Sequence, residues 1–336
     1  MAAESAGAGR PYRLHIENIA NKHEVFQITP ERYSAAEARH PELAALLDTT
    51  IGYDLEDFPK VAPEIDFTIG WELPFRSLAE TAPKLKVVHI IGAGVEHLFP
   101  LDWLPAGVSV TSNRGVATKA GEYVTVAVLA LNTWVPFYAT SKELRRWERV
   151  FVSGIEGKTL LVIGMGNLGR SGARRCKEMG MRVLGVRASG APDEAVHEMY
   201  RPEDLPRLLP QADFVLVAVP LTDRTRGLIG AEQFAQMKPG AGFINIARAA
   251  IVDQEALGRA LVSGQLSGAV LDVFDKEPLP ADSPVWSWPN CILTPHVSAD
   301  DVTRYMADTL DLFFENFQRF VDGRPLKNVV DPDRQY

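Results

Sequence analysis

Short apolar runs, rich in β-branched residues, alternate with helical patterns through the middle of the chain. The runs are apolar on both faces, as the strands of a buried parallel sheet must be. They cover residues 159–164, 181–186, 213–220, 242–247, 268–273 and 291–296. The helical patterns between them cover Leu168–Gly180, Ala231–Met237 and Asp253–Ser263. This alternation of strand and helix predicts an α/β fold with a doubly wound parallel sheet.

The N-terminal part shows a weaker form of the same alternation. Strands are predicted at residues 12–16, 66–70 and 86–91, and helices at Ala35–Asp48 and, more apolar, at residues 121–134. Near the C-terminus, residues 300–323 carry Met306, Leu310, Phe313, Phe314 and Phe317 at helical spacing. That spacing predicts an amphipathic helix with one face to bury.

A chain of 336 residues is long enough for two domains. The amphipathic helix follows the last strand of the central sheet, so the chain can return to the N-terminal domain there. We therefore predict a dinucleotide-binding Rossmann domain at 116–299, inserted into a flavodoxin-like substrate domain at 1–115 plus 300–336. Both are expected to be doubly wound parallel sheets.

Composition removes several classes of protein from consideration. The hydrophobic share of 46% and charged share of 23% are those of a soluble globular protein. No apolar run approaches the length of about 20 residues that crosses a bilayer. A net charge of −8 opposes nonspecific binding to nucleic acid or to anionic membranes. The first 13 residues lack the apolar stretch of a secretory signal and predict a mobile tail.

Cysteine usage gives the expected compartment. Only two cysteines occur, Cys176 and Cys291, and nothing in their spacing suggests a disulfide framework or a metal site. We therefore expect no metal and a reducing, cytoplasmic setting.

The segment LVIGMGNLG places three glycines in a G-x-G-x-x-G spacing between a predicted strand and a predicted helix. Gly164 permits a tight turn, Gly166 lets backbone approach a pyrophosphate, and Gly169 lets the helix pack on the strand. The amides of the first helical turn, including Asn167 and Leu168, would face the phosphates. A glycine-rich turn without a ligand is the alternative, but the flanking strand and helix favour a dinucleotide site.

The end of the second strand selects the cofactor. NAD sites place an acid there to bind the ribose hydroxyls, whereas an arginine accommodates a 2′-phosphate. This chain has Arg187 at that point and Ser189 two residues later. A guanidinium is a natural phosphate partner, so NADP is the preferred cofactor. If Arg187 instead stacks on adenine, NAD remains possible.

Three further stretches carry polar residues at the ends of predicted strands. Arg248 follows an apolar strand, Asp272 ends the next with Glu277 in the loop beyond, and His296 ends the last. Each alone could be structural. Together they form the set that carbonyl reduction needs: an arginine for a substrate carboxylate, and a histidine that a carboxylate orients as proton donor.

These motifs resemble those of the D-isomer-specific 2-hydroxyacid dehydrogenases, including the glyoxylate/hydroxypyruvate reductases. The segments VPLTDRTRGLIG, FINIARAAIVDQEAL, LDVFDKEPLP and TPH stand in that family's order, and the resemblance covers most of the chain. It implies that Arg248 binds substrate, Glu277 pairs with His296, and His296 donates the proton. It also implies dimerisation through the helix near 121–134.

The resemblance extends to cofactor and substrate contacts. It implies that Asp272 contacts the nicotinamide amide and that Ile246, Ala247 and His296 lie along the same half of the cofactor. The residues implied near the adenosine half are Val219, Pro220 and Thr225. The stretch IIGAGVEHL resembles the family's substrate loop, whose backbone amides at Ala93 and Gly94 would cradle a carboxylate. Departures are Glu96, where aspartate is common, and Tyr123, where many relatives have histidine.

The predicted function is therefore NAD(P)-dependent reduction of a 2-keto acid to the D-2-hydroxy acid. Glyoxylate, hydroxypyruvate and bulkier keto acids all carry the carboxylate and ketone required, so the substrate stays open. A formate- or phosphite-type dehydrogenase is one alternative, although formate oxidation in this family uses glutamine where Glu277 stands. A dinucleotide-sensing corepressor is the other, and motifs alone do not exclude it.

Overall fold

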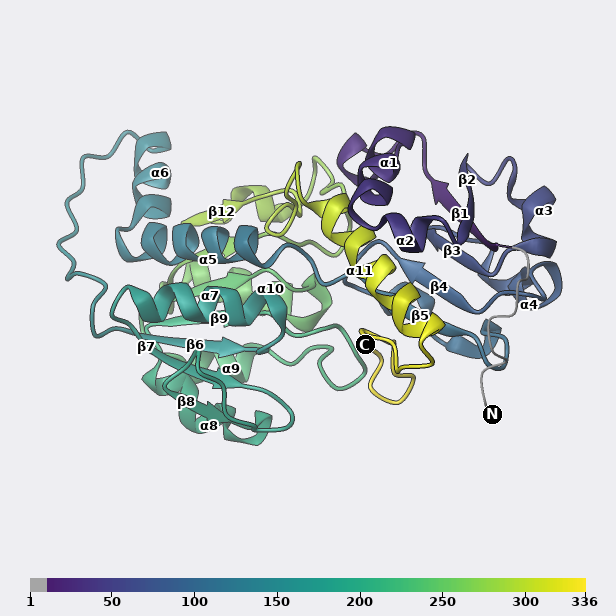
Figure 1. Ribbon diagram of the computed structural model, residues 1–336. Helices are drawn as coiled ribbons and strands as arrows, with labels where there is room; N and C mark the ends of the chain where they lie inside the picture. Colours follow the sequence, from purple (N-terminus) through teal and green to yellow (C-terminus); the bar gives the residue numbers. More distant parts are fainter. Residues whose placement is uncertain (1–10) are drawn as a thin grey trace. The chain divides into compact units, whose positions relative to one another are not determined.

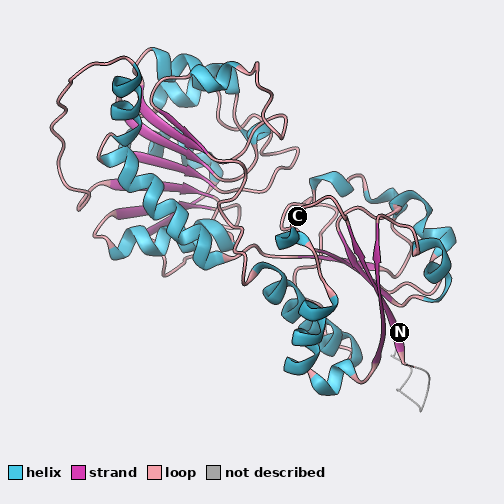
Figure 2. Ribbon diagram, turned by 90° about the horizontal axis from the view of Figure 1, so that it is seen from above, coloured by secondary structure: helices cyan, strands magenta, loops and turns pink. Residues whose placement is uncertain are grey.

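The computed structural model describes residues 11–336, and the chain divides into two compact units (Figure 1). One unit contains the residues before Ala117 together with Asp300–Tyr336, and the other spans Ala117–Ala299. Each unit has its own parallel sheet with helices on both faces (Figure 2), so the predicted fold class is confirmed. Most of the predicted N-terminal tail falls on residues 1–10, outside the described residues.

The sheet of the first unit has the strand order β2-β1-β3-β4-β5, and all its pairings are parallel. Its strands are β1 (Tyr12–Asn18), β2 (Leu47–Tyr53), β3 (Phe67–Gly70), β4 (Val87–Ile90) and β5 (Ser109–Ser112). Its helices are α1 (Pro30–Arg39), α2 (Pro41–Ala44), α3 (Phe58–Val61), α4 (Leu78–Thr81) and α11 (Tyr305–Val321).

Helix α11 supplies much of the core of this unit. The five apolar residues that predicted an amphipathic helix are all buried. They share a cluster with residues of β1 and β3, including Leu14 and Phe67, and the ring of Phe67 meets that of Phe317 edge-on at 5.2 Å. The C-terminal segment thus completes the hydrophobic core of the N-terminal part of the chain.

The helix predicted at Ala35–Asp48 is interrupted at His40 and ends at Ala44. Helix α1 ends before Pro41, because proline lacks an amide hydrogen and excludes its predecessor from the helical region. His40 accordingly has φ −130° and ψ 51°. A second short helix, α2, covers Pro41–Ala44, and strand β2 then begins at Leu47 and pairs with β1 at the sheet edge. Its polar residues are half-buried or exposed, so its sequence lacks the continuous apolar run of a central strand.

The sheet of the second unit has the order β12-β11-β10-β9-β6-β7-β8. Its strands are β6 (Thr159–Ile163), β7 (Arg182–Val186), β8 (Glu198–Tyr200), β9 (Phe214–Val217), β10 (Ala241–Asn245), β11 (Leu266–Leu271) and β12 (Cys291–Leu293). Its helices are α5 (Ala117–Asn132), α6 (Val135–Glu143), α7 (Asn167–Glu178), α8 (Leu205–Leu208), α9 (Ala231–Gln236) and α10 (Gln254–Val262). All six predicted strands are present, and β8 was not predicted.

The strand order predicts a ligand site beyond the carboxyl ends of the strands of this sheet. Strand β6 has β7 on one side and β9 on the other, so the chain reverses its direction of progress there. In open α/β sheets, ligands bind beyond the carboxyl ends of the strands at such a switch point. The predicted glycine turn follows β6 directly.

Among the described helices, no single one is long and apolar enough to span a membrane. The pair α5 and α6 passes that test only when taken together, and it is bent by 61° at the break.

Candidate active site

Close packing explains two of the three glycines in the turn between β6 and α7. Gly164 has φ +104°, and a Cβ there would lie 2.5 Å from the carbonyl carbon and oxygen of Ala218. A Cβ at Gly169 would lie 1.9 Å from the carbonyl oxygen of Gly164. No side chain fits at either position without moving backbone, so the fold itself requires both glycines.

Gly166 is different, because neither its conformation nor its packing requires glycine. Its φ is −76°, and a Cβ there would meet no other atom within 4 Å. As the N-cap of α7, Gly166 supplies no side-chain oxygen to the amides of the first turn, which includes Asn167 and Leu168. Open space at a helix N-terminus is the environment that a pyrophosphate needs. The turn therefore fits a bound dinucleotide.

This contrast predicts opposite effects for two alanine variants. Gly166→Ala is expected to weaken dinucleotide binding at least about tenfold, with little change in unfolding temperature, because its methyl group enters only the ligand's space. Gly169→Ala is expected to lower stability by about 3 kcal/mol, because its methyl group meets backbone. Thermal unfolding and calorimetric titration with NADPH measure both. A Gly166→Ala protein that unfolds early but binds normally would contradict the assignment.

The residues predicted for the adenosine half lie on the loops after β7 and β9. The Arg187 guanidinium donates to the carbonyl oxygens of Ala191 and Pro192, and Ser189 Oγ accepts a hydrogen bond from the Ala191 amide. After β9, Val219 packs against the core of the unit. In the same loop the hydroxyl of Thr225 donates to the carbonyl oxygen of Pro220 over 2.6 Å. Both groups follow the carboxyl ends of strands that flank β6, one on each side.

Glu277 and His296, 19 positions apart, meet in the second unit. His296 Nδ1 and Glu277 Oε2 are 2.7 Å apart, and the other carboxylate oxygen accepts the Phe274 amide over 2.9 Å. Both side chains are partly exposed, His296 at 42% and Glu277 at 35%. The histidine is therefore oriented by a carboxylate while part of its ring remains accessible to a substrate.

The two groups shift each other's titration. Burial alone raises the pKa of Glu277, but hydrogen bonds from His296 and the Phe274 amide, with the charges of His296 and Arg248, place it below its usual range. The hydrogen bond to Glu277 raises the pKa of His296 above 6.5, burial opposes this, and the Glu277 charge adds to the rise. The pair thus favours a protonated histidine beside an ionised carboxylate near neutral pH.

Arg248 lies close enough to this pair for its charge to lower the pKa of both partners. It follows β10 through the buried residues Ile246 and Ala247, which were predicted on the nicotinamide side. Its Nη1 donates to the Ala247 carbonyl oxygen over 2.8 Å, and its own carbonyl oxygen accepts from the Asn245 side chain. The side chains of the candidate site therefore lie beyond the carboxyl ends of β10, β11 and β12, which precede Arg248, Glu277 and His296 respectively.

Asp272 is fully buried and holds the turn that carries His296. Its Oδ1 accepts from the Thr294 hydroxyl over 2.6 Å and from the Val297 amide over 2.9 Å. Its Oδ2 accepts from the Ser298 amide over 2.9 Å. His296 has φ +56°, a conformation that non-glycine residues seldom adopt. The Asp272 carboxylate fixes this strained turn, a role that the sequence analysis did not assign to it.

Sequence reasoning also missed two side chains connected to Asp272 by hydrogen bonds, those of Thr294 and Tyr123. The Tyr123 hydroxyl on α5 lies 2.5 Å from Thr294 Oγ1, which in turn donates to Asp272. Burial raises the pKa of Tyr123, so its hydroxyl stays protonated. Tyr123 was noticed only as a departure from the family, and 171 positions separate it from Thr294. Nothing in the local sequence links the two.

Ala93 and Gly94 lie in the first unit, in the loop after β4. Ala93 is exposed and Gly94 is half-buried. The indole of Trp71 packs against this loop. A Cβ at Gly92 would lie 2.2 Å from the Trp71 ring, and the centroids of the Trp71 and His97 rings are 4.2 Å apart. The predicted carboxylate loop is therefore present as a short turn with an aromatic side chain against it.

Within residues 11–336, no group of three or more histidine, cysteine or acidic side chains is placed to hold a metal ion. Cys176 and Cys291 are both free thiols, and burial raises the pKa of each to about 12.

Comparison with known proteins gives relatives along nearly the whole chain. Over 323 residues it is 33% identical to a glyoxylate/hydroxypyruvate reductase B from Shigella boydii serotype 4, covering 92% of this chain and 91% of that protein. The chain spans about half the length of the D-3-phosphoglycerate dehydrogenases that it also matches, such as 49% of that from Methanocaldococcus jannaschii, at 34% identity over 76% of this chain.

Two solved structures are similar across the full length. A D-isomer specific 2-hydroxyacid dehydrogenase from Xanthobacter autotrophicus Py2, in complex with NADPH and MES, has a TM-score of 0.83 and 31% identity, covering 98% of this chain and 100% of that chain. An NADPH-dependent glyoxylate/hydroxypyruvate reductase from Sinorhizobium meliloti, in complex with NADP and sulfate, has a TM-score of 0.79 and 29% identity, covering 97% and 100%.

Residues 125–298 match the family described as D-isomer specific 2-hydroxyacid dehydrogenase, NAD binding domain. This match covers the glycine turn, Arg248, Glu277 and His296. The resemblance inferred from the motifs is confirmed, and the chain belongs to the D-isomer specific 2-hydroxyacid dehydrogenase family, whose members are oxidoreductases that use a nicotinamide dinucleotide.

Proposed function

We propose that this protein reduces a 2-keto acid to the corresponding D-2-hydroxy acid, with NADPH preferred over NADH. The observation that carries the proposal is the His296–Glu277 pair, 2.7 Å apart and close to Arg248 in the unit that contains the dinucleotide turn. When bound, the reduced nicotinamide supplies the hydride to the keto carbon. Glyoxylate and hydroxypyruvate lead the candidate substrates, because relatives and a solved neighbour carry those names.

His296 is the proposed proton donor. Its Nδ1 faces Glu277, so in the protonated ring Nδ1–H donates to the carboxylate and Nε2–H is directed to the substrate oxygen. The raised pKa keeps this proton in place near neutral pH. General acid catalysis of this kind contributes about 10²- to 10⁴-fold to a rate.

Arg248 is the proposed anchor for the substrate carboxylate and the polariser of its keto oxygen. Its Nη1 donates to the Ala247 carbonyl oxygen, which restricts the orientation of the guanidinium. The amides of Ala93 and Gly94 are proposed as donors to a substrate carboxylate.

The chain offers a complete set of groups for the dinucleotide. Gly166 and the amides of Asn167 and Leu168 would hold the pyrophosphate, and Arg187 with Ser189 the 2′-phosphate. The residues proposed along the adenosine and nicotinamide halves are Val219, Pro220, Thr225, Ile246, Ala247 and Asp272. Preference for NADPH is supported by Arg187 and by the NADPH- and NADP-bound neighbours.

A panel of keto acids assayed with NADPH and with NADH tests the proposal. Loss of reduced-nicotinamide absorbance is expected with at least one 2-keto acid, and a higher kcat/KM with NADPH. The product is expected to be the D isomer, which chiral chromatography identifies. No turnover with any 2-keto acid would sink the assigned reaction, and a wide margin for NADH would sink the assigned cofactor preference.

The pH dependence of the reduction follows from the His296–Glu277 pair. Because only protonated His296 donates, kcat/KM is expected to fall as pH rises through a midpoint above 6.5, the ordinary histidine value. Glu277→Gln removes the charge that favours the protonated ring, so the midpoint is expected to move to lower pH. Initial rates at saturating NADPH across pH 5–10 measure it. A midpoint that Glu277→Gln leaves in place would contradict the pairing.

We also propose that the protein is a homodimer that acts in the cytoplasm. Among residues 11–336, more than half of the large exposed apolar side chains belong to α5, α6 and the irregular segment 144–158. Figure 1 shows the path of these three segments. The side chains are Val126, Leu129, Val135, Tyr138, Leu144, Trp147, Phe151 and Val152. Exposed apolar surface of this extent marks a protein interface, and a second copy offers the same face. The free thiols fit a reducing compartment.

Replacing the two most exposed aromatic residues tests the dimer. Trp147 is 94% exposed and Phe151 is 82% exposed. The double change Trp147→Ser with Phe151→Ser is expected to weaken association at least about tenfold, because aromatic side chains dominate such interfaces. Light scattering after size exclusion gives the mass. Trp286→Ser, at an exposed tryptophan elsewhere in the same unit, is the matched control. A monomeric wild type would end the dimer proposal.

A further inference from the structure

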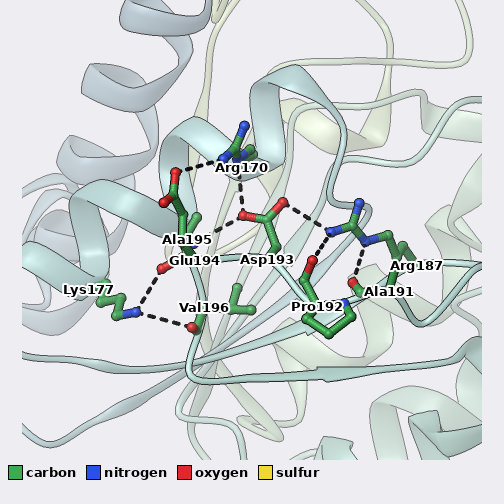
Figure 3. A network of polar contacts seen from close by, with 9 residues as sticks. All are labelled: Arg170, Lys177, Arg187, Ala191, Pro192, Asp193, Glu194, Ala195 and Val196. Atoms are coloured by element: carbon green, nitrogen blue, oxygen red, sulfur yellow. Dashed lines mark hydrogen bonds and ion pairs between the residues drawn. The ribbon is translucent and has the colours of Figure 1, made fainter.

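The loop after β7 is tied together by one arginine (Figure 3). Arg187 Nε donates to the Ala191 carbonyl oxygen over 3.0 Å, and Nη2 donates to the Pro192 carbonyl oxygen over 3.2 Å. Nη2 also donates to Asp193 Oδ2 over 3.0 Å. All three acceptors belong to the same short loop, which turns back on itself at Gly190 with φ +64°. Arg187 is therefore held in one orientation before any ligand arrives.

Asp193 lies between two arginines from different elements. Its Oδ2 accepts from Arg187, and its Oδ1 accepts from Arg170 Nε on α7 over 3.0 Å and from the Ala195 amide over 3.0 Å. The Asp193 side chain is only 8% exposed. Burial tends to raise its pKa, but the Ala195 amide and the two guanidinium groups outweigh burial and lower it. Asp193 is thus an ionised carboxylate that links β7 to the dinucleotide helix.

Helix α7 fixes the same loop at two more points. Arg170 Nη2 pairs with Glu194 Oε1 over 2.9 Å, and Lys177 donates to the carbonyl oxygens of Glu194 and Val196 over 2.8 and 3.1 Å. Figure 3 shows these contacts side by side with those of Arg187. Helix α7 begins at the glycine turn. These contacts therefore fix the position of the loop relative to the helix that would face the pyrophosphate.

A count of donors shows which part of Arg187 is available. A guanidinium has five N–H donors. Nε has one and uses it on Ala191, and Nη2 has two and uses them on Pro192 and Asp193. The remaining two are on Nη1, which makes no hydrogen bond to any residue of the described chain. The Arg187 side chain is 28% exposed, and Nη1 is not among the fully buried side-chain atoms that lack a partner, so this edge can meet a ligand.

We propose that Asp193 is the positioning residue for recognition of the 2′-phosphate, because it holds Arg187 so that the Nη1 edge is presented to that group. The inference deepens the proposed function and rests on its preference for NADPH. Asp193 touches no ligand itself. It acts through Arg187, and it is not the ribose-binding acid of an NAD site, because its two oxygens are already shared by two arginines and an amide.

Two effects of the Asp193 charge oppose each other. Its negative charge weakens the attraction of the site for a phosphate. Its hydrogen bonds, however, restrict Arg187 before binding, so less side-chain conformational entropy is lost when the phosphate binds. The bonds are the larger effect, because Asp193 also orders the loop that supplies the Ala191 and Pro192 acceptors. Removing it releases all three restraints on Arg187. Immobilising a rotamer-rich side chain corresponds to about tenfold in affinity.

Calorimetric titration with 2′,5′-ADP and with 5′-AMP tests the inference, because these probes differ only in the 2′-phosphate. The wild type is expected to bind 2′,5′-ADP more tightly. Asp193→Ala is expected to lower the ratio of the two affinities about tenfold with 5′-AMP binding unchanged. Arg187→Gln is expected to lower the ratio at least as far.

Two further variants sharpen the result. Asp193→Asn keeps an acceptor for the Ala195 amide and is expected to lower the ratio by less, so it serves if Asp193→Ala folds poorly. Glu194→Gln is the matched control: it removes the same charge from the neighbouring residue, which pairs with Arg170 but does not touch Arg187. Its ratio is expected to stay within about twofold of wild type.

The possible outcomes distinguish a failure of this inference from a failure of the proposed NADPH preference. If Arg187→Gln lowers the ratio but the Asp193 variants leave or raise it, Asp193 does not position Arg187 and only this inference is overturned. If Asp193→Ala weakens both probes equally, its role is merely structural, and the inference is again overturned. If the wild type binds both probes equally, the NADPH preference itself fails and the inference falls with it.

Discussion

We expect His296→Gln to lower kcat for keto-acid reduction by about 10²- to 10⁴-fold, since a general acid contributes that much. Glutamine keeps a hydrogen-bond donor near the same place but has no proton to give at neutral pH. Steady-state rates with saturating keto acid and NADPH measure the loss. Binding of NADPH, followed by titration, is expected to stay close to wild type.

A control variant at a second histidine shows whether the loss of turnover is specific to His296. His197 lies in the same unit, and one of its ring nitrogens accepts the Val183 amide at the opposite end of β7 from Arg187. His197→Gln is therefore expected to keep its turnover. Full activity in His296→Gln would show that another group supplies the proton, and the proposed mechanism would have to be abandoned.

We expect Arg248→Met to lower kcat/KM for the keto acid by about 10²- to 10⁴-fold. Two hydrogen bonds to a charged carboxylate are worth about 1.5–3 kcal/mol each, and each 1.36 kcal/mol is tenfold in rate. Methionine keeps much of the length of the side chain but none of its donors. Initial rates over a range of keto-acid concentrations give the ratio directly.

Two companion variants interpret the Arg248 result. Arg248→Lys keeps the charge without the forked donors, so it is expected to fall between wild type and Arg248→Met. Arg259→Met removes an exposed arginine on α10 that pairs only weakly with Glu255 at 3.5 Å, and it is expected to be silent. If Arg248→Met binds and turns over keto acids normally, the substrate carboxylate is held elsewhere.

The sequence predicted the parts of the fold that rest on continuous apolar runs and on glycine spacing. Strands β6, β9 and β10 of the second unit are buried on both faces, and β7 and β11 nearly so, so their apolar runs are unbroken and easily found. Strand β2 was missed because it is an edge strand whose polar residues, Asp48 to Thr50, interrupt its apolar run. The glycine motif identified the turn, but it did not distinguish Gly164 and Gly169, which packing requires, from Gly166, which it does not.

In the candidate site, the sequence identified the residues of its motifs but not the contacts among them. Glu277 and His296 were paired through a family resemblance, and their 2.7 Å contact lies on the loops after two neighbouring strands. The roles of Asp193 and Thr294 depend on loops that fold back on themselves. No periodicity marks such contacts, because each one is fixed by the path of the backbone rather than by the composition of an element.

The buried carboxylate of Asp272 has a consequence for the mobility of the catalytic turn. The amides of Val297 and Ser298 lie in a loop, yet both donate to a group sealed inside the unit. Their hydrogens are therefore expected to exchange with solvent as slowly as those of a sheet strand, which local opening of an ordinary loop would not allow. The proposed proton donor is thus carried on a rigid support, and its orientation does not wait for a substrate to order it.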